Sequence, residues 1–145
     1  MRKLVLTVIL AAFAIPAVSA QNGAENLPQE ARDFIDEHFA TETVSRVEKE
    51  DSWFSWDKNE MYEVYFSNGL RLDFNKQGEI TEISGEDGIS LPQEAFPAAL
   101  ISYINSNYPG TQPESWERED DKQEVELSDG TELEFDLDGN FLKAD

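Results

Sequence analysis

The sequence predicts an α+β fold in which one helix and a four-stranded antiparallel sheet form a unit that occurs twice in tandem, with the helices on one face. Three observations lead to this prediction. The segment 62–74 returns at 123–135 with its turn in the same place. The apolar period is near 3.6 before each copy and two within it. Each half also opens with Leu-Pro-Gln-Glu-Ala, at 27–31 and 91–95.

Residues 1–20 have the pattern of a secretory signal peptide. Arg2 and Lys3 supply its positive end, and a largely apolar stretch follows at 4–18. Small residues precede the expected cleavage point, so the mature chain is expected to begin at Gln21. The apolar stretch is short for a membrane anchor, and no later stretch is longer. The sequence therefore predicts a periplasmic or secreted protein with no membrane span after cleavage.

The chain is strongly acidic. It carries 31 acidic and 11 basic residues, a formal charge of −20, and both halves contribute. Such a field repels nucleic acid and anionic lipid. It favours a basic partner or cations, although solubility explains the composition equally well. The absence of cysteine excludes disulfides, thiol catalysis and cysteine-bound zinc.

A stub at 21–26 is expected to be flexible, and the two repeats follow it at 27–88 and 89–145. The helix of the first repeat is predicted at about 28–40, because proline is tolerated in a first helical turn and five apolar or aromatic positions share one face. These positions are Ala31, Phe34, Ile35, His38 and Phe39.

The helix of the second repeat is predicted to begin later relative to its Leu-Pro segment. Pro97 would break a helix begun at Pro92, so the regular part is expected at about 97–106. Asn26 and Ser90 precede the two Leu-Pro segments, and each has a glutamine three residues later. This spacing predicts that they cap the helices.

After each helix, apolar residues alternate with polar ones, as in strands that bury one face. Asn68-Gly69 and Asp129-Gly130 separate two such strands in each repeat. These dipeptides are typical of a two-residue type I′ hairpin. The remaining strands are indicated by the turn glycines Gly78 and Gly139 and by the earlier apolar positions Val44, Val47 and Trp116.

The first repeat contains eight more residues than the second between its first two strands. This insertion is rich in aromatic side chains, namely Trp53, Phe54 and Trp56. Large aromatics dominate the energetics of protein interfaces, so one interpretation is a loop that contacts a partner. The other interpretation is a lid that folds back over the core.

The strongest charged pattern lies in the second repeat. Pairing across Asp129-Gly130 would place Glu126 opposite Glu132 and Glu124 opposite Glu134. Like charges on facing strands cost stability, which suggests a use in binding a basic partner or cations. A solvated face is the alternative. On the same face the first repeat has a mixed, partly aromatic set: Met61, Glu63, Tyr65, Arg71 and Asp73.

No catalytic or metal-binding constellation is predicted. His38, the only histidine, has no nucleophile at helical spacing. Asp136-Leu137-Asp138-Gly139-Asn140 resembles half of a calcium loop but lacks the flanking helices and terminal glutamate of an EF-hand, so a hairpin turn is expected. Paired carboxylates could hydrolyse glycosides only in a cleft, and none is indicated. No cofactor is expected.

The residues quoted above resemble a known family. The order Leu-Pro, helix, then [Tyr/Gln]-Glu-Val-x-[Phe/Leu]-Ser-[Asn/Asp]-Gly-x-x-Leu-x-Phe-x-x-x-Gly is similar to the PepSY-like, β-lactamase-inhibitor-like proteins. The resemblance covers residues 27–145 and implies exported proteins with tandem helix-plus-four-strand units. It also implies likeness to an inhibitor that grips its enzyme with the open face of its sheet, and to domains of protease propeptides. A shared fold does not transfer a target.

These observations lead to an expected function. The chain is expected to be a non-enzymatic, exported module that binds an unidentified protein or peptide, favouring a basic one, and so inhibits or chaperones an envelope or secreted enzyme. The alternatives are a calcium-binding or envelope-stress protein and, last, a hydrolase. The predicted binding residues are Trp53, Phe54, Trp56, Met61 and Tyr65 as apolar anchors, and Glu124, Glu126, Glu132 and Glu134 for charge complementarity.

Overall fold

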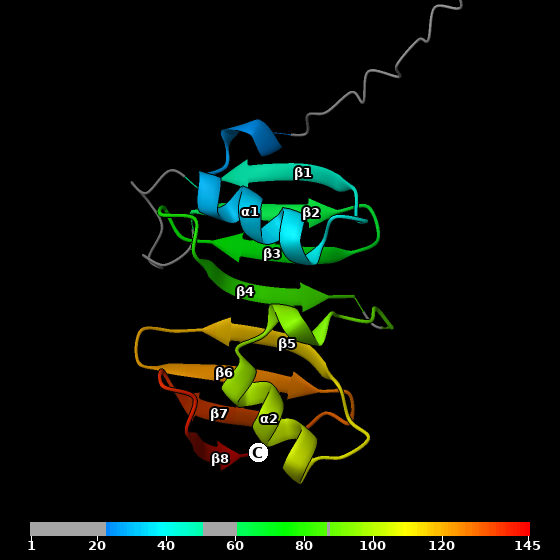
Figure 1. Ribbon diagram of the computed structural model, residues 1–145, viewed down its shortest axis with the longest axis vertical. Helices are drawn as coiled ribbons and strands as arrows, with labels where there is room; N and C mark the ends of the chain where they lie inside the picture. The colour runs from blue at the N-terminus through cyan, green and yellow to red at the C-terminus, as the bar shows by residue number, and fades with distance from the viewer. Residues whose placement is uncertain (1–22, 51–60, 87) are drawn as a thin grey trace, which may run out of the picture.

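The computed structural model describes residues 23–50, 61–86 and 88–145 and contains one antiparallel sheet of eight strands. The strands follow one another across the sheet in chain order, and both α-helices lie on the same face (Figure 1). The predicted tandem α+β fold is therefore confirmed. The elements are η1 (Ala24–Asn26), α1 (Gln29–His38), β1 (Val44–Lys49), β2 (Tyr62–Phe66), β3 (Leu70–Phe74), β4 (Ile80–Gly85), η2 (Gln93–Ala95), α2 (Ala98–Asn107), β5 (Pro113–Arg118), β6 (Lys122–Leu127), β7 (Glu132–Asp136) and β8 (Phe141–Ala144).

The helices start at prolines. The N-cap positions are Pro28 and Pro97, and neither helix has a side-chain cap. The predicted caps Asn26 and Ser90 are wrong, because each is followed by a buried leucine and then by Pro28 or Pro92, which hold the chain extended before a helix can begin. In the second repeat the intervening residues form the separate turn η2, as expected from Pro97.

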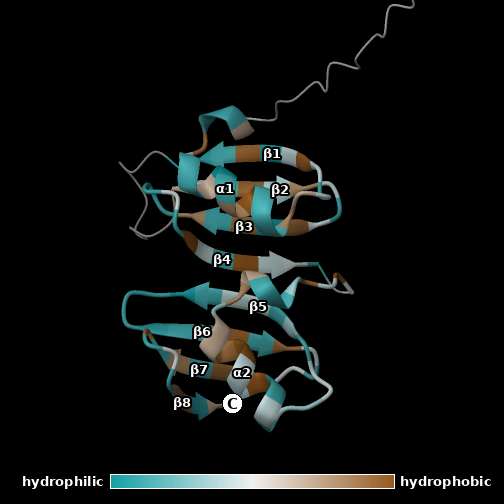
Figure 2. Ribbon diagram, in the orientation of Figure 1, coloured by the Kyte–Doolittle hydropathy of each residue, from teal (hydrophilic) through white to brown (hydrophobic). Residues whose placement is uncertain are grey.

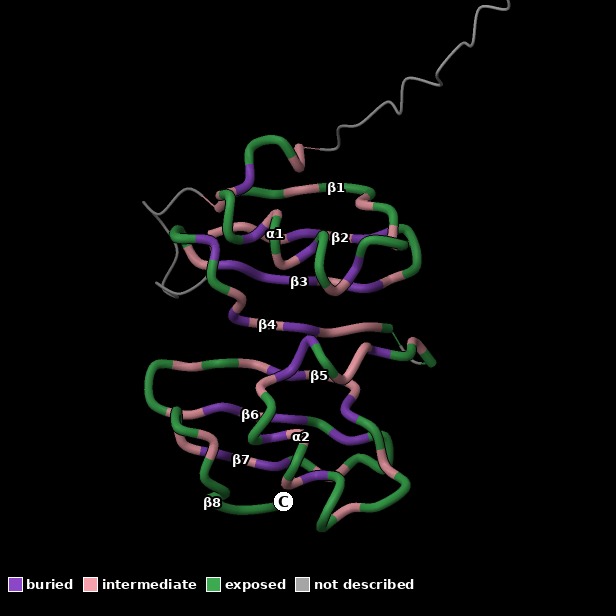
Figure 3. The backbone as a smooth tube through the Cα atoms, viewed as in Figure 1, coloured by how far each residue is buried: buried purple, intermediate pink, exposed green. Residues whose placement is uncertain are grey.

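The core lies between the helices and one face of the sheet. Successive strands place one apolar residue each in register, and this row is buried on the six inner strands: Val64, Leu72, Ile83, Trp116, Val125 and Leu133. The buried segments follow the middle of the inner strands and the sheet-facing side of the helices (Figure 3). Hydrophobic residues concentrate in the same places (Figure 2).

The two repeats share one sheet through β4 and β5. Glu82 lies opposite Glu117, and Ser84 lies opposite Ser115, while Ile83 and Trp116 form the buried pair between them. Both core residues are at most 3% exposed. Burial of this pair offsets the cost of placing Glu82 and Glu117 side by side.

The hairpin turns differ from the predicted two-residue form. The Gly69 N–H donates to the Phe66 carbonyl, so Ser67 and Asn68 occupy the centre of the turn. Gly69 follows with a φ of +91°. This is the three-residue loop, in which a glycine with positive φ comes after the turn. The prediction was wrong because an Asn-Gly pair is compatible with both the two-residue and the three-residue hairpin loop.

A second glycine turn in each repeat touches the helix that covers it. A Cβ at Gly78 would lie 2.8 Å from Pro28 Cβ and 2.9 Å from Ala31 N. At the equivalent place in the second repeat, a Cβ at Gly139 would lie 2.7 Å from Ala99 Cβ. Glycine at these turns therefore lets both helices approach the sheet closely. Because both helices lie on this one face, no described element covers the opposite face of the sheet.

Candidate functional site

The uncovered face of the sheet carries one continuous row of acids. Because side chains alternate along a strand, both residues beside each core position point to this face. One of these two forms a row that runs in register from strand to strand. In this row, strands β1 to β7 each contribute an acidic residue, and β8 contributes a lysine. We call this set the acidic row: Glu48, Glu63, Asp73, Glu82, Glu117, Glu124 and Glu134, with Lys143 at its end.

The row confirms part of the predicted charge pattern and extends it. Glu124 lies opposite Glu134, and Glu126 opposite Glu132, as expected. The residues that sequence analysis did not place on this face are the acids Glu48, Glu82 and Glu117 and the lysines Lys122 and Lys143. The repeat itself carried a signal for them, because Glu48, Glu63 and Asp73 occupy the same positions as Glu117, Glu124 and Glu134.

In the first repeat, Arg71 on β3 binds the acids around it. Its Nε donates to Asp73 Oδ1 at 2.9 Å and its Nη2 donates to Asp73 Oδ2. Glu63 and Glu82 lie 3.5 and 3.9 Å from Nη2. Asp73 is fully buried. Partial burial lowers the pKa of Arg71, but the hydrogen bonds and charge of Asp73, with Glu82 and Glu63, outweigh this and raise it.

In the second repeat, lysines on other strands take this role. Lys122 Nζ lies 2.5 Å from Glu124 and 3.2 Å from Glu134, and Lys143 Nζ lies 3.2 Å from Glu134. The hydrogen bond to Glu124 is the main cause of the raised pKa of Lys122. Partial desolvation raises the pKa of Glu134, but its two lysine partners outweigh this and lower it.

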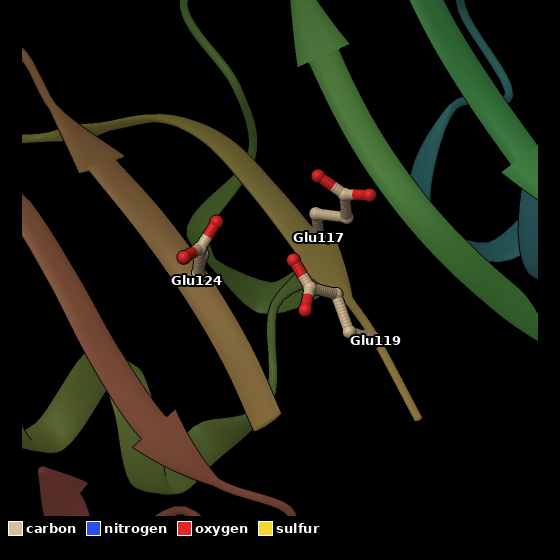
Figure 4. A group of neighbouring side chains, drawn as sticks. All are labelled: Glu117, Glu119 and Glu124. Atoms are coloured by element: carbon tan, nitrogen blue, oxygen red, sulfur yellow. The ribbon is translucent and has the colours of Figure 1, made fainter. Parts of the chain in front are cut away.

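Three carboxylates gather where the repeats meet. Atoms of Glu117, Glu119 and Glu124 lie within 4.8 Å of one another, and all three residues are partly buried (Figure 4). Lys122 approaches Glu119 to 3.8 Å. Carboxylate oxygens are the ligands that calcium prefers, so the chemistry of this group suits a hard cation.

A second row of side chains lies beside the first on the same face, and its charge changes from positive to negative along the sheet. We call it the polarised row: Arg46, Tyr65, Arg71, Ser84, Ser115, Glu126, Glu132 and Asp145. It is basic and aromatic in the first repeat and acidic in the second.

The aromatic part of the polarised row is Tyr65. The Arg46 guanidinium lies 4.0 Å from the centre of the Tyr65 ring, and that of Arg71 lies 5.9 Å away. The Tyr65 hydroxyl donates to Glu63, and this hydrogen bond is the main cause of its raised pKa. A hollow of about 460 Å³ opens beside Tyr65, between Arg46 and Ser84.

The predicted apolar anchors have different outcomes. Tyr65 lies on the uncovered face, half-buried. Met61 is also half-buried and its backbone continues the pairing of β2, accepting from Glu50 N and donating to the Phe74 carbonyl. Trp53, Phe54 and Trp56 lie outside the described residues, so the two interpretations of the aromatic loop remain predictions.

Two features set aside from the sequence have structural roles. The His38 ring packs 4.7 Å from the Phe34 ring at the end of α1. Asp136 to Asn140 form a turn in which Asp136 Oδ1 accepts from the backbone N–H groups of Asp138 and Asn140.

Comparison with known proteins adds a family to this geometry. Residues 60–143 match the family described as "Putative beta-lactamase-inhibitor-like, PepSY-like". The chain belongs to this family. The predicted resemblance is therefore confirmed.

Several solved structures are similar to this chain over most of their length. A "putative calcium-regulated periplasmic protein" from Bacteroides thetaiotaomicron is 34% identical, with 84% of this chain and 92% of that chain covered and a TM-score of 0.75. A "putative periplasmic protein" from Bacteroides vulgatus is 34% identical, with the same coverage and a TM-score of 0.74. Another from Bacteroides vulgatus is 32% identical, with 86% and 96% covered and a TM-score of 0.73.

The search of curated proteins found no match. Among the residues that the structure describes, none of the helices of this PepSY-like protein has the length and apolar character needed to span a membrane.

Proposed function

We propose that this PepSY-like protein is a periplasmic or secreted, non-enzymatic module that docks a basic segment of an exported protein on the uncovered face of its sheet. The observation that carries the proposal is the acidic row, which crosses seven neighbouring strands without interruption. Antiparallel strands lie about 4.8 Å apart, so the row is roughly 29 Å long. Its length suits an extended segment or a helix laid across the strands.

Arg71, Lys122 and Lys143 offset part of the repulsion among the carboxylates of the row, and the excess of acids favours the docking of a further cation. Carboxylates on facing strands repel one another, and Glu82, Glu117 and Glu124 are neighbours across three strands. They are partly buried, which strengthens the repulsion relative to water. A lysine or arginine from a partner would relieve it. The face also contains the hollow beside Tyr65, where an apolar partner side chain could anchor.

The similar structures support an exported location for this chain, since three of them carry the description "putative" periplasmic protein. Docking on an enzyme would block or hold it, in keeping with the inhibitor-like description of the family.

Crosslinking capture from the envelope of the source organism tests this proposal. The bait is the mature protein, compared with a triple variant, Glu82→Gln/Glu117→Gln/Glu124→Gln. The control, Glu30→Gln/Asp36→Asn/Glu37→Gln, loses the same charge from the exposed side of α1. A partner held by the wild type and the control, but lost by the first variant, supports the proposal. Equal loss in both variants would show only an effect of net charge and would reject the sheet face.

Calcium binding is the second candidate function. The cluster of Glu117, Glu119 and Glu124 favours it, as does the relative described as calcium-regulated. The test is thermal unfolding at millimolar Ca²⁺ or Mg²⁺, with the wild type and Glu119→Gln. A rise in Tm specific to Ca²⁺ and lost in the variant supports this function. Equal responses to both ions, or an unchanged Glu119→Gln response, reject it.

A further inference from the structure

The two outer strands of the sheet are equivalent to the two strands that join the repeats. On β3 and β4, Asp73 lies opposite Glu82 and Leu72 opposite Ile83. On β7 and β8, the equivalent pairs are Glu134 with Lys143 and Leu133 with Ala144, with the register shift in the same place. Thus β8 is the second copy of β4.

The same comparison makes β1 the first copy of β5. Val47 lies opposite Val64 and Glu48 opposite Glu63, as Trp116 lies opposite Val125 and Glu117 opposite Glu124. Inside the chain β4 pairs with β5. Because β8 is equivalent to β4, its backbone is arranged to pair with a strand equivalent to β5, and β1 is such a strand. Within the described residues, no strand of the same chain lies beyond β8 (Figure 1).

We propose that β8 is a docking edge for β1 of a second copy of this protein, in the register by which β4 accepts β5. Lys143 would lie opposite Glu48 of the other copy, Ala144 opposite Val47, and Asp145 opposite Arg46. The sheet would continue head to tail from one copy into the next, with all helices on one face.

Charge complementarity supports a second copy as the occupant. Within the chain, the equivalent positions hold Glu82 opposite Glu117 and Ser84 opposite Ser115, an acidic pair and a neutral pair. Between copies, both positions would hold opposite charges. Facing strands are stabilised by opposite charges and destabilised by like charges.

The two rows on the uncovered face continue across this junction. The polarised row ends at Asp145 on one side and begins at Arg46 on the other. The acidic row ends at Lys143 and begins at Glu48. The β8 edge also holds two large apolar side chains exposed to water, Phe141 at 37% and Leu142 at 54%, and pairing would cover part of that surface.

The short helix η1 controls access to β1. It lies beyond β1 at the end of the sheet (Figure 1). A Cβ at Gly23 would lie 3.7 Å from the Val47 carbonyl oxygen and 3.2 Å from Val47 Cβ. Val47 is the central residue of the proposed pairing, so η1 must move before another copy can dock. Covered edges of this kind limit self-association, and η1 sets the concentration at which copies join.

Sedimentation velocity over a concentration series tests the proposal. Gly23→Val detaches η1, because a β-branched residue is strained at a φ of +91° and its Cβ meets Val47. A second variant lacks residues 21–26 and keeps the buried Leu27. Circular dichroism confirms folding. Both variants should associate at concentrations at least tenfold lower than the wild type. If both are folded and remain monomeric throughout, the proposal is wrong.

Charge reversal identifies the edges that pair. In the Gly23→Val background, Glu48→Lys or Lys143→Glu should weaken association about tenfold, because a favourable cross-strand pair becomes unfavourable. The double reversal should restore it to within about threefold. Glu37→Lys, on the exposed side of α1, is the matched control and should have no such effect. Association that responds to Lys143→Glu but not to Glu48→Lys would show β8 pairing with β8, and would overturn the proposal.

Discussion

Arg71 and Asp73 form an ion pair on the uncovered face in which the carboxylate is fully buried. Replacement of Arg71 by Met removes both hydrogen bonds to the fully buried Asp73. It also leaves Glu63 and Glu82 beside that carboxylate, one on each neighbouring strand. Breaking one side of a buried pair costs about 3–5 kcal/mol. The Arg71 side chain is 32% exposed, so water screens part of this cost, and we expect about 3 kcal/mol.

Urea unfolding followed by tryptophan fluorescence, to which the buried Trp116 contributes, measures this effect. With an m value of about 1.5 kcal/mol/M, a loss of about 3 kcal/mol lowers the midpoint by about 2 M. Arg71→Met/Asp73→Asn should recover about 1–2 kcal/mol, because a neutral amide is less costly to bury than a carboxylate. Arg46→Met removes a more exposed ion pair and should change stability by less than about 0.5 kcal/mol. If Arg71→Met and Arg46→Met cost the same, the reasoning is refuted.

Two further predictions concern glycine and pH. Gly78→Ala should cost about 3 kcal/mol, because a Cβ there meets Pro28 and the backbone of Ala31 at a positive φ. Gly130→Ala, also at positive φ but with nothing within 4 Å, should cost about 1 kcal/mol, and equal losses of unfolding free energy would contradict the close helix approach. Hydrogen bonds from the Asn140 side chain and backbone lower the pKa of Asp136 in the folded state. Its contribution to stability is therefore present above the unfolded pKa of about 3.9 and is lost as pH falls through the lower folded value. The free energy of unfolding should decline from about pH 5 downward, and it should decline less steeply with pH in Asp136→Asn. Chemical unfolding at several pH values measures this, and the same pH dependence in the wild type and the variant would argue against this role.

The sequence predicted the repeat, the strand pairs and the side of the sheet on which most charges lie. These depend on local features: the alternation around Val125, for example, and the glycine after each hairpin. The full acidic row was not predictable, because it requires β4 and β5 to be neighbours in register. That pairing depends on burying Ile83 against Trp116, a contact between repeats that no local pattern encodes.

Local rules also failed where two structures share one signal. Asn68-Gly69 is compatible with both hairpin loops, and the longer one lets Asn68 Oδ1 accept from the Leu70 N–H at 3.1 Å. The capping pattern predicted at Asn26 and Ser90 did not form, because Pro28 and Pro92 hold the chain extended after them. Arg71 was placed on this face from the sequence, but Lys122 and Lys143 were missed because the repeats place their cations differently. Glu132 occupies the position of Arg71, and Met61 that of Lys122.

Photo-crosslinking from a single position tests most directly whether the uncovered face binds the partner. A benzoylphenylalanine at Ser84, in the middle of that face beside the junction of the repeats, is compared with one at Ser102, on the exposed side of α2. Both proteins are expressed in the envelope and irradiated. We expect one partner crosslinked from Ser84 and lost in the Glu82→Gln/Glu117→Gln/Glu124→Gln background. The same partner captured from Ser102 and not from Ser84 would contradict the account.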